Sequence, residues 1–288
     1  MTAPAGAPGA GDVVVQSARA GEPDRYLAAL LAPAAARPHL VALAAFSSEI
    51  GRVASAVTRE PLMGEIRLQW WRDALSSAGP GALSGNPVAD AVRAAALACE
   101  LSRDLLLGVV DAAALDLARQ PLADDAALAD YLKRRQSALF ALAAGVLGGA
   151  ALPALPAAAE ASGLAYGLAQ LLLGLPRSLA RGRLPLPVSR LRAAGISPEA
   201  VLAGSPGEGI AGVLATLRAQ ARDSLTTARR RVADLPREIR PAFLPLALVE
   251  PYLRAMERWN RDSLREPVQI SPLARVTRIA ARYWLGRF

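Results

Sequence analysis

The spacing of apolar residues is the feature of this chain that most constrains its fold. Apolar side chains recur every three or four residues along most of the sequence, and no alternation of period two lasts long enough to predict a strand. Alanine and leucine dominate, whereas aromatic residues make up only 5% of the chain. Such a mixture favours helix over sheet at almost every position. We therefore predict an all-α protein.

Composition also predicts how the chain is divided. Hydrophobic residues make up 53% of the 288 residues, which is enough for a sizeable core. Residues 1–20 begin with small residues and are expected to form a disordered tail, and residues 21–288 are expected to form one helical domain because no linker divides them. The main expected helices are 23–31, 38–57, 60–75, 87–98, 102–120, 126–147, 157–175, 210–235 and 272–285. Pro176 is expected to end the helix that precedes it.

The segment 136–159 carries no charge and is long enough to cross a bilayer. It is interrupted by four helix-breaking residues, which are Gly148, Gly149, Pro153 and Pro156. Two buried helices joined by a turn therefore explain the segment better, and a membrane span is the alternative.

Single residues and charge exclude several classes of function. Cys99 is the only cysteine, so a disulfide framework or a thiol metal cluster is excluded. His39 is the only histidine, which argues against zinc and Ser-His-Asp sites. The net charge is +8 and rests almost wholly on arginine, which favours contact with anionic lipid, phosphate or an acidic partner. The arginines are spread along the chain without a recognition motif, so no nucleic-acid partner is expected.

The segment 163–187 reads GLAYGLAQLLLGLPRSLARGRLPLP. It brings an apolar helical run to a turn with three arginines, Arg177, Arg181 and Arg183, and no acidic residue occurs between 163 and 183. This pattern predicts the mouth of an anion-binding site that lacks a carboxylate to hold a metal or move a proton.

Two stretches together resemble the squalene/phytoene synthase family. RPHLVALAAFSSEIGRVAS at 37–55 and the segment 163–187 are similar to the two halves of that family's active site. The second stretch aligns without a gap with the family's pattern G-x-A-x-Q-L-x-N-I-L-R-D-x-x-x-D-x-x-R-G-R-x-Y-L-P. The resemblance covers most of the chain from about Asp24 onward. It implies an isoprenoid-synthase-like helical bundle around a central cavity.

The resemblance also implies two DxxxD pairs, which in the family hold Mg²⁺ ions for two prenyl diphosphates. Carboxylates four residues apart share a helix face, so both can reach the same ions. In this chain the first pair falls on Gly51 and Ser55, and the second pair falls on Gly174 and Ser178. We therefore expect no metal, no cofactor and no catalytic residue. Glu49 lies on another face of the helix and is expected to pair with Arg52.

Part of the family's anion-binding apparatus is retained. The resemblance carries over to Arg37, Arg181 and Arg183, and the family's asparagine falls on Gln170. Arg52 and Arg177 are additional. All six are candidates for binding an anion or another ligand.

EPLMGEIRLQWWRDAL at 60–75 is similar to a narrower branch of the family, which includes a mitochondrial assembly factor for respiratory complex I. The branch implies a non-catalytic protein whose partners are complex I subunits or assembly intermediates, with an isoprenoid or anionic lipid as a further ligand. Adjacent tryptophans cannot face one direction, so one of Trp70 and Trp71 is expected in the core. We take Trp70 as a candidate for contact with a partner.

The last helix predicts a second kind of contact. Its apolar residues fall on one side, and Arg275, Arg278 and Arg282 fall on the other. A basic amphipathic helix with Trp284 at its end can lie on an anionic membrane. The alternative is that the apolar side packs on the protein itself. We expect a cytoplasmic protein, and peripheral contact with the inner face of the inner membrane is left open.

Two other functions are retained as alternatives. A prenyltransferase that condenses two prenyl diphosphates would need Mg²⁺ ligands from elsewhere, for which Glu49, Glu65 and Asp73 are the nearby candidates. A non-catalytic protein that holds a polyprenyl lipid would need an apolar cavity with arginines at its mouth.

Overall fold

The computed structural model describes residues 9–56, 61–76, 83–119, 121–258 and 264–286, with the side chains of 54–56 and 61 outside the description. Within these ranges the chain is helical and contains no strand, which confirms the predicted fold class. The first helices are α1 (Ala10–Gly21), α2 (Pro23–Leu30), α3 (Arg37–Ala56), α4 (Pro61–Ser76), α5 (Pro87–Ala98), α6 (Arg103–Leu117), α7 (Asp125–Leu132), a π-helical turn η1 (Lys133–Ser137) and α8 (Ala138–Val146). The others are α9 (Leu155–Ala180), α10 (Val188–Ala193), α11 (Pro198–Leu202), α12 (Ile210–Ala233), a 3₁₀ helix η2 (Arg240–Leu248), α13 (Val249–Arg258) and α14 (Pro272–Leu285).

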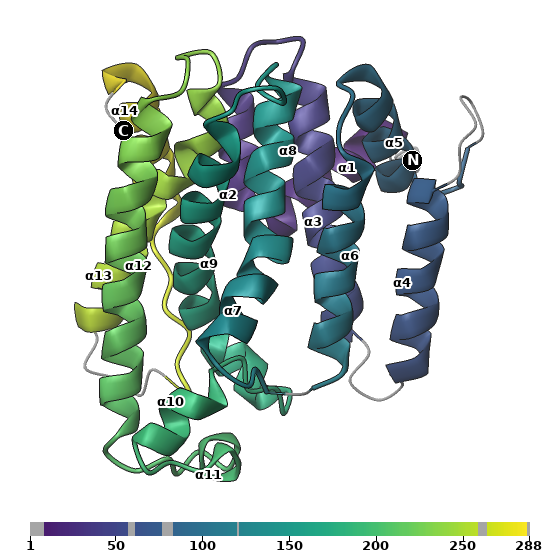
Figure 1. The fold of residues 1–288 in the computed structure, drawn as a ribbon. Helices are drawn as coiled ribbons and strands as arrows, with labels where there is room; N and C mark the ends of the chain where they lie inside the picture. Colours follow the sequence, from purple (N-terminus) through teal and green to yellow (C-terminus); the bar gives the residue numbers. More distant parts are fainter. Residues whose placement is uncertain (1–8, 57–60, 77–82, 120, 259–263, 287–288) are drawn as a thin grey trace, which may run out of the picture.

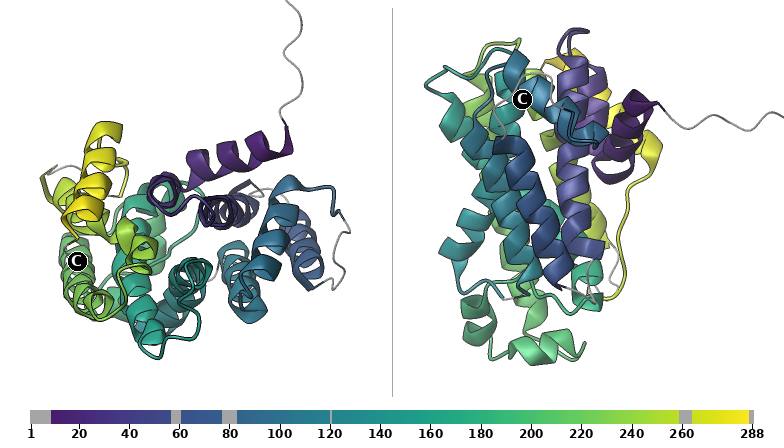
Figure 2. Two further views of the ribbon diagram at one scale, coloured as in Figure 1. Left: turned by 90° about the horizontal axis from the view of Figure 1, so that it is seen from above. Right: turned by 90° about the vertical axis from the view of Figure 1, so that its right-hand side faces the viewer.

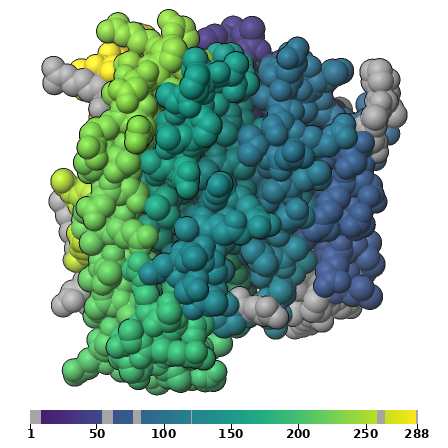
Figure 3. Space-filling view, viewed as in Figure 1, coloured from purple at the N-terminus to yellow at the C-terminus, as the bar shows by residue number. Residues whose placement is uncertain are grey.

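The long helices stand side by side, with α4 at one end of the bundle and α12 to α14 at the other (Figures 1 and 2). The short helices α10 and α11 form a projection below the bundle (Figure 3). Two groups of buried side chains make up the interior, one around α9 and α12 and one around α3, α5 and α6. Helix α8 joins them, because Phe140 belongs to the first group and Leu139 and Leu142 to the second. Phe140 also packs on Phe243 and Tyr166, with ring centroids 5.6 and 5.8 Å apart.

The expected disordered tail is wrong for its second half, because residues 10–20 lie in α1. The prediction rested on the small residues at the start of the chain, but an amphipathic helix follows them. Val14 and Ala18 are buried against α3, and Ser17 donates a hydrogen bond to Glu49 Oε1 at 3.0 Å. A β-carbon at Gly21 would lie 2.1 Å from Ser48 Oγ, so glycine allows the two helices to approach. Residues 1–8 lie outside the described residues.

Two helix boundaries also differ from the predictions. Pro176 does not end α9, which continues through Ala180. Proline inside a helix costs about 3 kcal/mol. Leu172, Leu173 and Leu175 are buried on that turn, and each buried leucine contributes about 2 kcal/mol. The helix expected at 126–147 is divided by the π-helical turn η1.

The uncharged segment 136–159 folds as predicted into two helices, since α8 ends at Val146 and α9 begins at Leu155. Among the described residues, no helix is both long and apolar enough to span a membrane.

Candidate functional site

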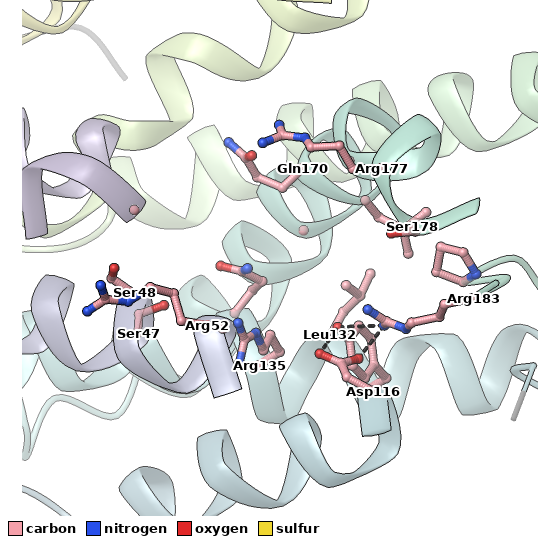
Figure 4. A pocket seen from close by; sticks show the side chains of 18 of the residues that line it. Ser47, Ser48, Arg52, Asp116, Leu132, Arg135, Gln170, Arg177, Ser178 and Arg183 are labelled. Carbon is pink, nitrogen blue, oxygen red and sulfur yellow. Dashed lines mark hydrogen bonds and ion pairs between the residues drawn. The ribbon is translucent and has the colours of Figure 1, made fainter. Parts of the chain in front are cut away.

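A cavity of about 420 Å³ lies between the second half of α3 and the second half of α9 (Figure 4). Its walls also include the end of α1, residues of α6 and α7, the turn η1 and the loop at 181–185. Six arginines line it, namely Arg52, Arg119, Arg135, Arg177, Arg181 and Arg183. The acidic residues on the wall are Glu22 and Asp116. The predicted anion-binding mouth and the first motif therefore meet at one cavity.

Glycines on α9 allow the turn η1 to reach this wall. A β-carbon at Gly163 would lie 2.1 Å from Ser137 Oγ, and one at Gly167 would lie 3.1 Å from Gln136 Cγ. These approaches bring η1 against α9. A π turn inserts one residue into the helical register and is common at functional sites. It places Arg135 and Gln136 on the cavity wall, although neither was identified from the sequence.

Arg135 lies where the first motif would need a carboxylate. Its Nη2 is 2.9 Å from the position of a β-carbon built on Gly51. Figure 4 shows Arg135 between the α3 residues Ser47 and Arg52 on one side and Asp116 on the other. Its Nη1 is buried and has no hydrogen-bond partner among the described residues. A guanidinium in this place repels a metal cation and attracts an anion.

The other three motif positions also offer no carboxylate. Gly174 and Ser178 line the cavity from α9, and a β-carbon at Gly174 would meet nothing within 4 Å. Ser55 lies in the last turn of α3, and its side chain is outside the described residues. Glycine has no side-chain oxygen, and a neutral hydroxyl is a poor ligand for a hard cation. The residues present do not fit the family's Mg²⁺ pair.

Arg183 is held by a buried partner that the sequence did not reveal. It forms an ion pair with Asp116, whose side chain is only 5% exposed, and it donates a hydrogen bond to Tyr131 Oη at 3.2 Å. Burial lowers the pKa of Arg183, but Asp116 and Tyr131 outweigh it and raise that pKa above its usual value. Arg183 therefore stays charged, and Asp116 balances its charge.

A second polar cluster lies behind the cavity around Asp24, a buried residue of α2. Asp24 accepts hydrogen bonds from Tyr252 Oη at 2.7 Å, Tyr166 Oη at 2.9 Å and Gln170 Nε2 at 3.2 Å. Arg275 Nε lies 2.8 Å from Asp24 Oδ1. Burial raises the pKa of Asp24, and its hydrogen bonds and the neighbouring arginines offset part of that rise. The candidate Gln170 thus joins the cavity to this cluster.

The acidic residues near the mouth are also engaged. Glu49 pairs with Arg52, which confirms the prediction from their spacing. Glu22 accepts a hydrogen bond from Ser47 Oγ at 2.6 Å and lies 3.6 Å from Arg25 Nε. Arg25 in turn donates to Gln136 Oε1 at 2.9 Å. Charge on the wall is therefore balanced at Arg52 and Arg183, whereas Arg177 and Arg181 are exposed at the mouth.

Arg37, one of the six ligand candidates, lies away from the cavity. It is exposed at the start of α3 and donates a hydrogen bond to the carbonyl of Ala32 at 3.2 Å. Ser47, which lines the cavity, lies ten residues further along the helix, or about 15 Å. Arg37 therefore holds the turn before α3 and does not reach the cavity.

The carboxylates considered for a metal-dependent enzyme do not converge. Glu49 is bound to Arg52 and Ser17, Glu65 is exposed on α4, and Asp73 Oδ1 accepts a hydrogen bond from Gln69 Nε2 at 2.9 Å. None of the three lines the cavity.

The contact candidates of the last helix differ in their exposure. Arg275 and Arg282 are partly buried, and Arg275 reaches Asp24, so Arg275 is wrong as a membrane contact. Arg278 and Trp284 are exposed, with Trp284 78% accessible. The prediction failed for Arg275 because an amphipathic pattern cannot reveal a buried acid elsewhere in the chain. On α4, Trp71 is buried and Trp70 is 37% exposed, as expected for adjacent tryptophans.

Sequence reasoning missed Asp24, Asp116, Tyr131, Arg135 and Gln136. Their partners lie 15 to 228 residues away along the chain. The π turn that directs Arg135 inward has no sequence signature of its own. One available signal was the isolated polar segment KRRQS at Lys133–Ser137, between an acidic helix and an uncharged one.

The helical fold is the one seen in squalene synthases. The chain superposes with a TM-score of 0.77 on a dehydrosqualene synthase at 13% identity, over 97% of each chain. It superposes with a TM-score of 0.71 on squalene synthase HpnC from Alicyclobacillus acidocaldarius at 19% identity, over 86% of this chain and 93% of that one.

The family follows from the sequence match. The model of the family described as Squalene/phytoene synthase matches residues 18–274, and the chain belongs to this family. The chain is 27% identical to NADH dehydrogenase (ubiquinone) complex I, assembly factor 6 of Bos taurus, over 92% of this chain and 79% of the relative. It is 28% identical to the protein of the same name from Mus musculus, over 93% of this chain and 81% of that relative.

Proposed function

We propose that this protein is a non-catalytic member of the squalene/phytoene synthase family that assists the assembly of membrane-bound respiratory complex I. The similarity to proteins named complex I assembly factor 6 extends over more than nine tenths of the chain for two of them, which supports this role. Its partners would be complex I subunits or assembly intermediates, at the inner face of the membrane that holds the complex. The exposed Trp70 on α4 is the proposed contact with such a partner.

The observation that carries the non-catalytic part is the position of Arg135. Ionisation of a prenyl diphosphate in this family depends on Mg²⁺ to neutralise the leaving group. Here a guanidinium lies 2.9 Å from the β-carbon position of Gly51, where the first carboxylate would begin. An arginine side chain can bind a phosphate directly. Unlike a metal ion, it cannot leave the site together with the diphosphate. The cavity would therefore bind its ligand without metal and without turnover.

The ligand proposed for the cavity is an anionic headgroup with an apolar tail, such as an isoprenoid phosphate. Arg177 and Arg181 at the mouth would meet the headgroup first, and Arg135 would hold it inside. Leu132 and Leu171 supply apolar wall. This combination also supports the second candidate function, a polyprenyl lipid-binding protein.

A calorimetric titration with farnesyl and geranylgeranyl diphosphate, with Mg²⁺ and with EDTA, tests the cavity. We expect binding that does not depend on Mg²⁺, no condensed hydrocarbon product, and loss of binding in Arg135→Gln. Arg192→Gln, an exposed arginine on α10, is the control. Binding that depends on Mg²⁺ together with a condensed product would establish the prenyltransferase alternative.

The assembly role is tested in cells. Deletion of the gene is expected to lower the amount of mature complex I on native gels and its NADH:ubiquinone activity, while the other respiratory complexes are unchanged. Re-expression of Arg135→Gln then shows whether the cavity takes part in assembly. A normal level of complex I after deletion would exclude the role.

A further inference from the structure

The back of the cavity, towards the interior of the bundle, is closed by polar side chains. Gln170 and Gln136 line the cavity there, and each is bound to a buried charged residue. Gln170 Nε2 donates a hydrogen bond to Asp24 at 3.2 Å, and Gln136 Oε1 accepts one from Arg25 Nη2 at 2.9 Å. Asp24 is 2% exposed and Arg25 is 8% exposed. The cavity therefore ends at a polar wall of these four residues, which we call the back wall.

Aromatic rings fill the space behind the back wall. The guanidinium carbon of Arg25 lies 4.6 Å from the centroid of the Phe140 ring and 5.3 Å from that of the Tyr166 ring. Phe140 also stacks on Phe243. All three aromatic residues are buried, with at most 2% of their surface exposed. An apolar chain could pass here only by displacing these rings and breaking the hydrogen bonds of the back wall.

Two hollows against the apolar core are too small for a lipid tail. One lies beside Leu172 and Met256, and the other lies beside Leu40 and Leu139. Their volumes are about 10 and 20 Å³, so each has room for about one water molecule. Neither can hold a five-carbon prenyl unit, whereas the arginine-lined cavity has about 420 Å³.

The charge of the cavity is positive on more than one side. Six arginines and two acids line it, and both acids are already paired with arginines. Figure 4 shows Arg177 beside Gln170 on α9, and Arg135 apart from them, between α3 and Asp116. Each guanidinium can bind one phosphate through two N–H groups. Two separate guanidinium groups therefore suit a ligand that carries two linked anionic groups.

We propose that the cavity recognises a compact polyphosphate group and that any apolar tail attached to this group stays outside the back wall, at the mouth. The proposal rests on the function proposed above for the same cavity and narrows it, because the charged headgroup alone would set the affinity. Leu132 and Leu171 would contact only the first carbons of a tail.

Calorimetry of the full-length protein in EDTA, with ligands that share a diphosphate and differ in the tail, tests the proposal. The series consists of inorganic pyrophosphate and of dimethylallyl, farnesyl and geranylgeranyl diphosphate. Inorganic phosphate and farnesol represent a single charged group and a tail alone. We expect the four diphosphates to bind within about threefold of one another, inorganic phosphate to bind at least about tenfold more weakly, and farnesol not to bind.

A tail that entered the protein would give a different series. Each buried methylene raises the affinity by about fourfold, so the added prenyl unit of geranylgeranyl diphosphate would raise it by more than about a hundredfold. Affinity that rises with tail length in this way would overturn the present proposal and leave the isoprenoid phosphate proposed for the cavity in place. A lack of binding by every diphosphate would overturn both.

Two variants separate the headgroup from the tail. Arg177→Gln is expected to weaken the binding of pyrophosphate and of farnesyl diphosphate by the same factor, about tenfold. Leu171→Ala is expected to change neither affinity by more than about threefold. A large loss in Leu171→Ala that is confined to farnesyl diphosphate would overturn the proposal, because the tail would then be recognised.

The matched control is Arg192→Gln, which removes the same charge from an exposed site on α10 outside the cavity. It is expected to bind all four diphosphates as the wild type does. A loss equal to that of Arg177→Gln would mean that the ligands are attracted by net charge alone, and this result would also overturn the proposal. Circular dichroism establishes that each variant is folded.

Discussion

The Nη2 atom of Arg135 lies 2.9 Å from the place that a β-carbon on Gly51 would take. Gly51 belongs to α3 and Arg135 belongs to the π turn before α8. Glycine leaves room for the guanidinium, and the guanidinium supplies fixed positive charge to a wall from which the family's carboxylate is missing. The relationship predicts that replacing one residue will not restore a metal site.

Gly51→Asp is the direct test. We expect the new carboxylate to pair with Arg135 and to lower the affinity of the cavity for anionic ligands by at least about tenfold, because a like charge is placed beside the ligand. Gly51→Ala, which adds the β-carbon without charge, separates crowding from electrostatics. Calorimetry of both variants with and without Mg²⁺ makes the measurement. If Gly51→Asp bound its ligand only with Mg²⁺, the prediction that one substitution does not restore a metal site would be wrong.

Asp116→Asn tests the ion pair beneath the loop at 181–185. Asp116 is buried, and its removal leaves Arg183 without its counter-charge. We expect the free energy of unfolding to fall by about 3 kcal/mol, the scale for breaking a buried pair. Urea denaturation measures it. Asp116→Asn/Arg183→Met removes both charges and is expected to recover part of the loss, and equal stability of the single and double variants would refute the pairing.

The all-α fold, most helix boundaries and the mouth of the cavity could be predicted from the sequence. Helical periodicity reports local structure, and the arginines of 177–183 are close together in the chain. The partners of those arginines could not be predicted in the same way. Asp24 meets Tyr252 across 228 residues, and only the folded chain brings them together. The prediction for Arg275 was wrong for this reason: its place on a basic stripe suggested a membrane contact, whereas in the fold it binds Asp24.

Asp24→Asn tests the buried cluster through pH. Burial raises the pKa of Asp24 above its usual value of 3.8, so the folded protein holds this proton more tightly than the unfolded chain does. The contribution of Asp24 to stability is therefore complete below pH 3.8 and declines as pH rises towards the folded-state pKa. Unfolding free energies of wild type minus variant, measured from acid pH upward, should decline over that window. A difference that grows with pH would mean that the folded state stabilises the charged form.

Arg275 is expected to act as the anchor of α14. Arg275→Gln removes the charge that meets Asp24 at 2.8 Å, and hydrogen exchange of the α14 amides should become faster because the helix is then held mainly by Ile279. Arg278→Gln changes an exposed arginine of the same helix and should leave exchange unchanged in the absence of lipid. Equal exchange in both variants would show that packing alone holds α14.

Trp70 and Trp71 are neighbours with ring centroids 5.3 Å apart, yet they are expected to have separate roles. Trp71 is 3% exposed and packs on Phe46 at 5.4 Å, so Trp71→Ala should lower the free energy of unfolding by about 3–5 kcal/mol. Trp70 is 37% exposed among Leu62, Met63 and Ile66, which are all exposed on α4, so Trp70→Ala should cost less than about 1 kcal/mol. Urea denaturation measures both values.

If Trp70 contacts a complex I assembly intermediate, Trp70→Ala should abolish capture of that intermediate from solubilised membranes while the protein stays folded. Undiminished capture by this stable variant would remove α4 as the partner surface.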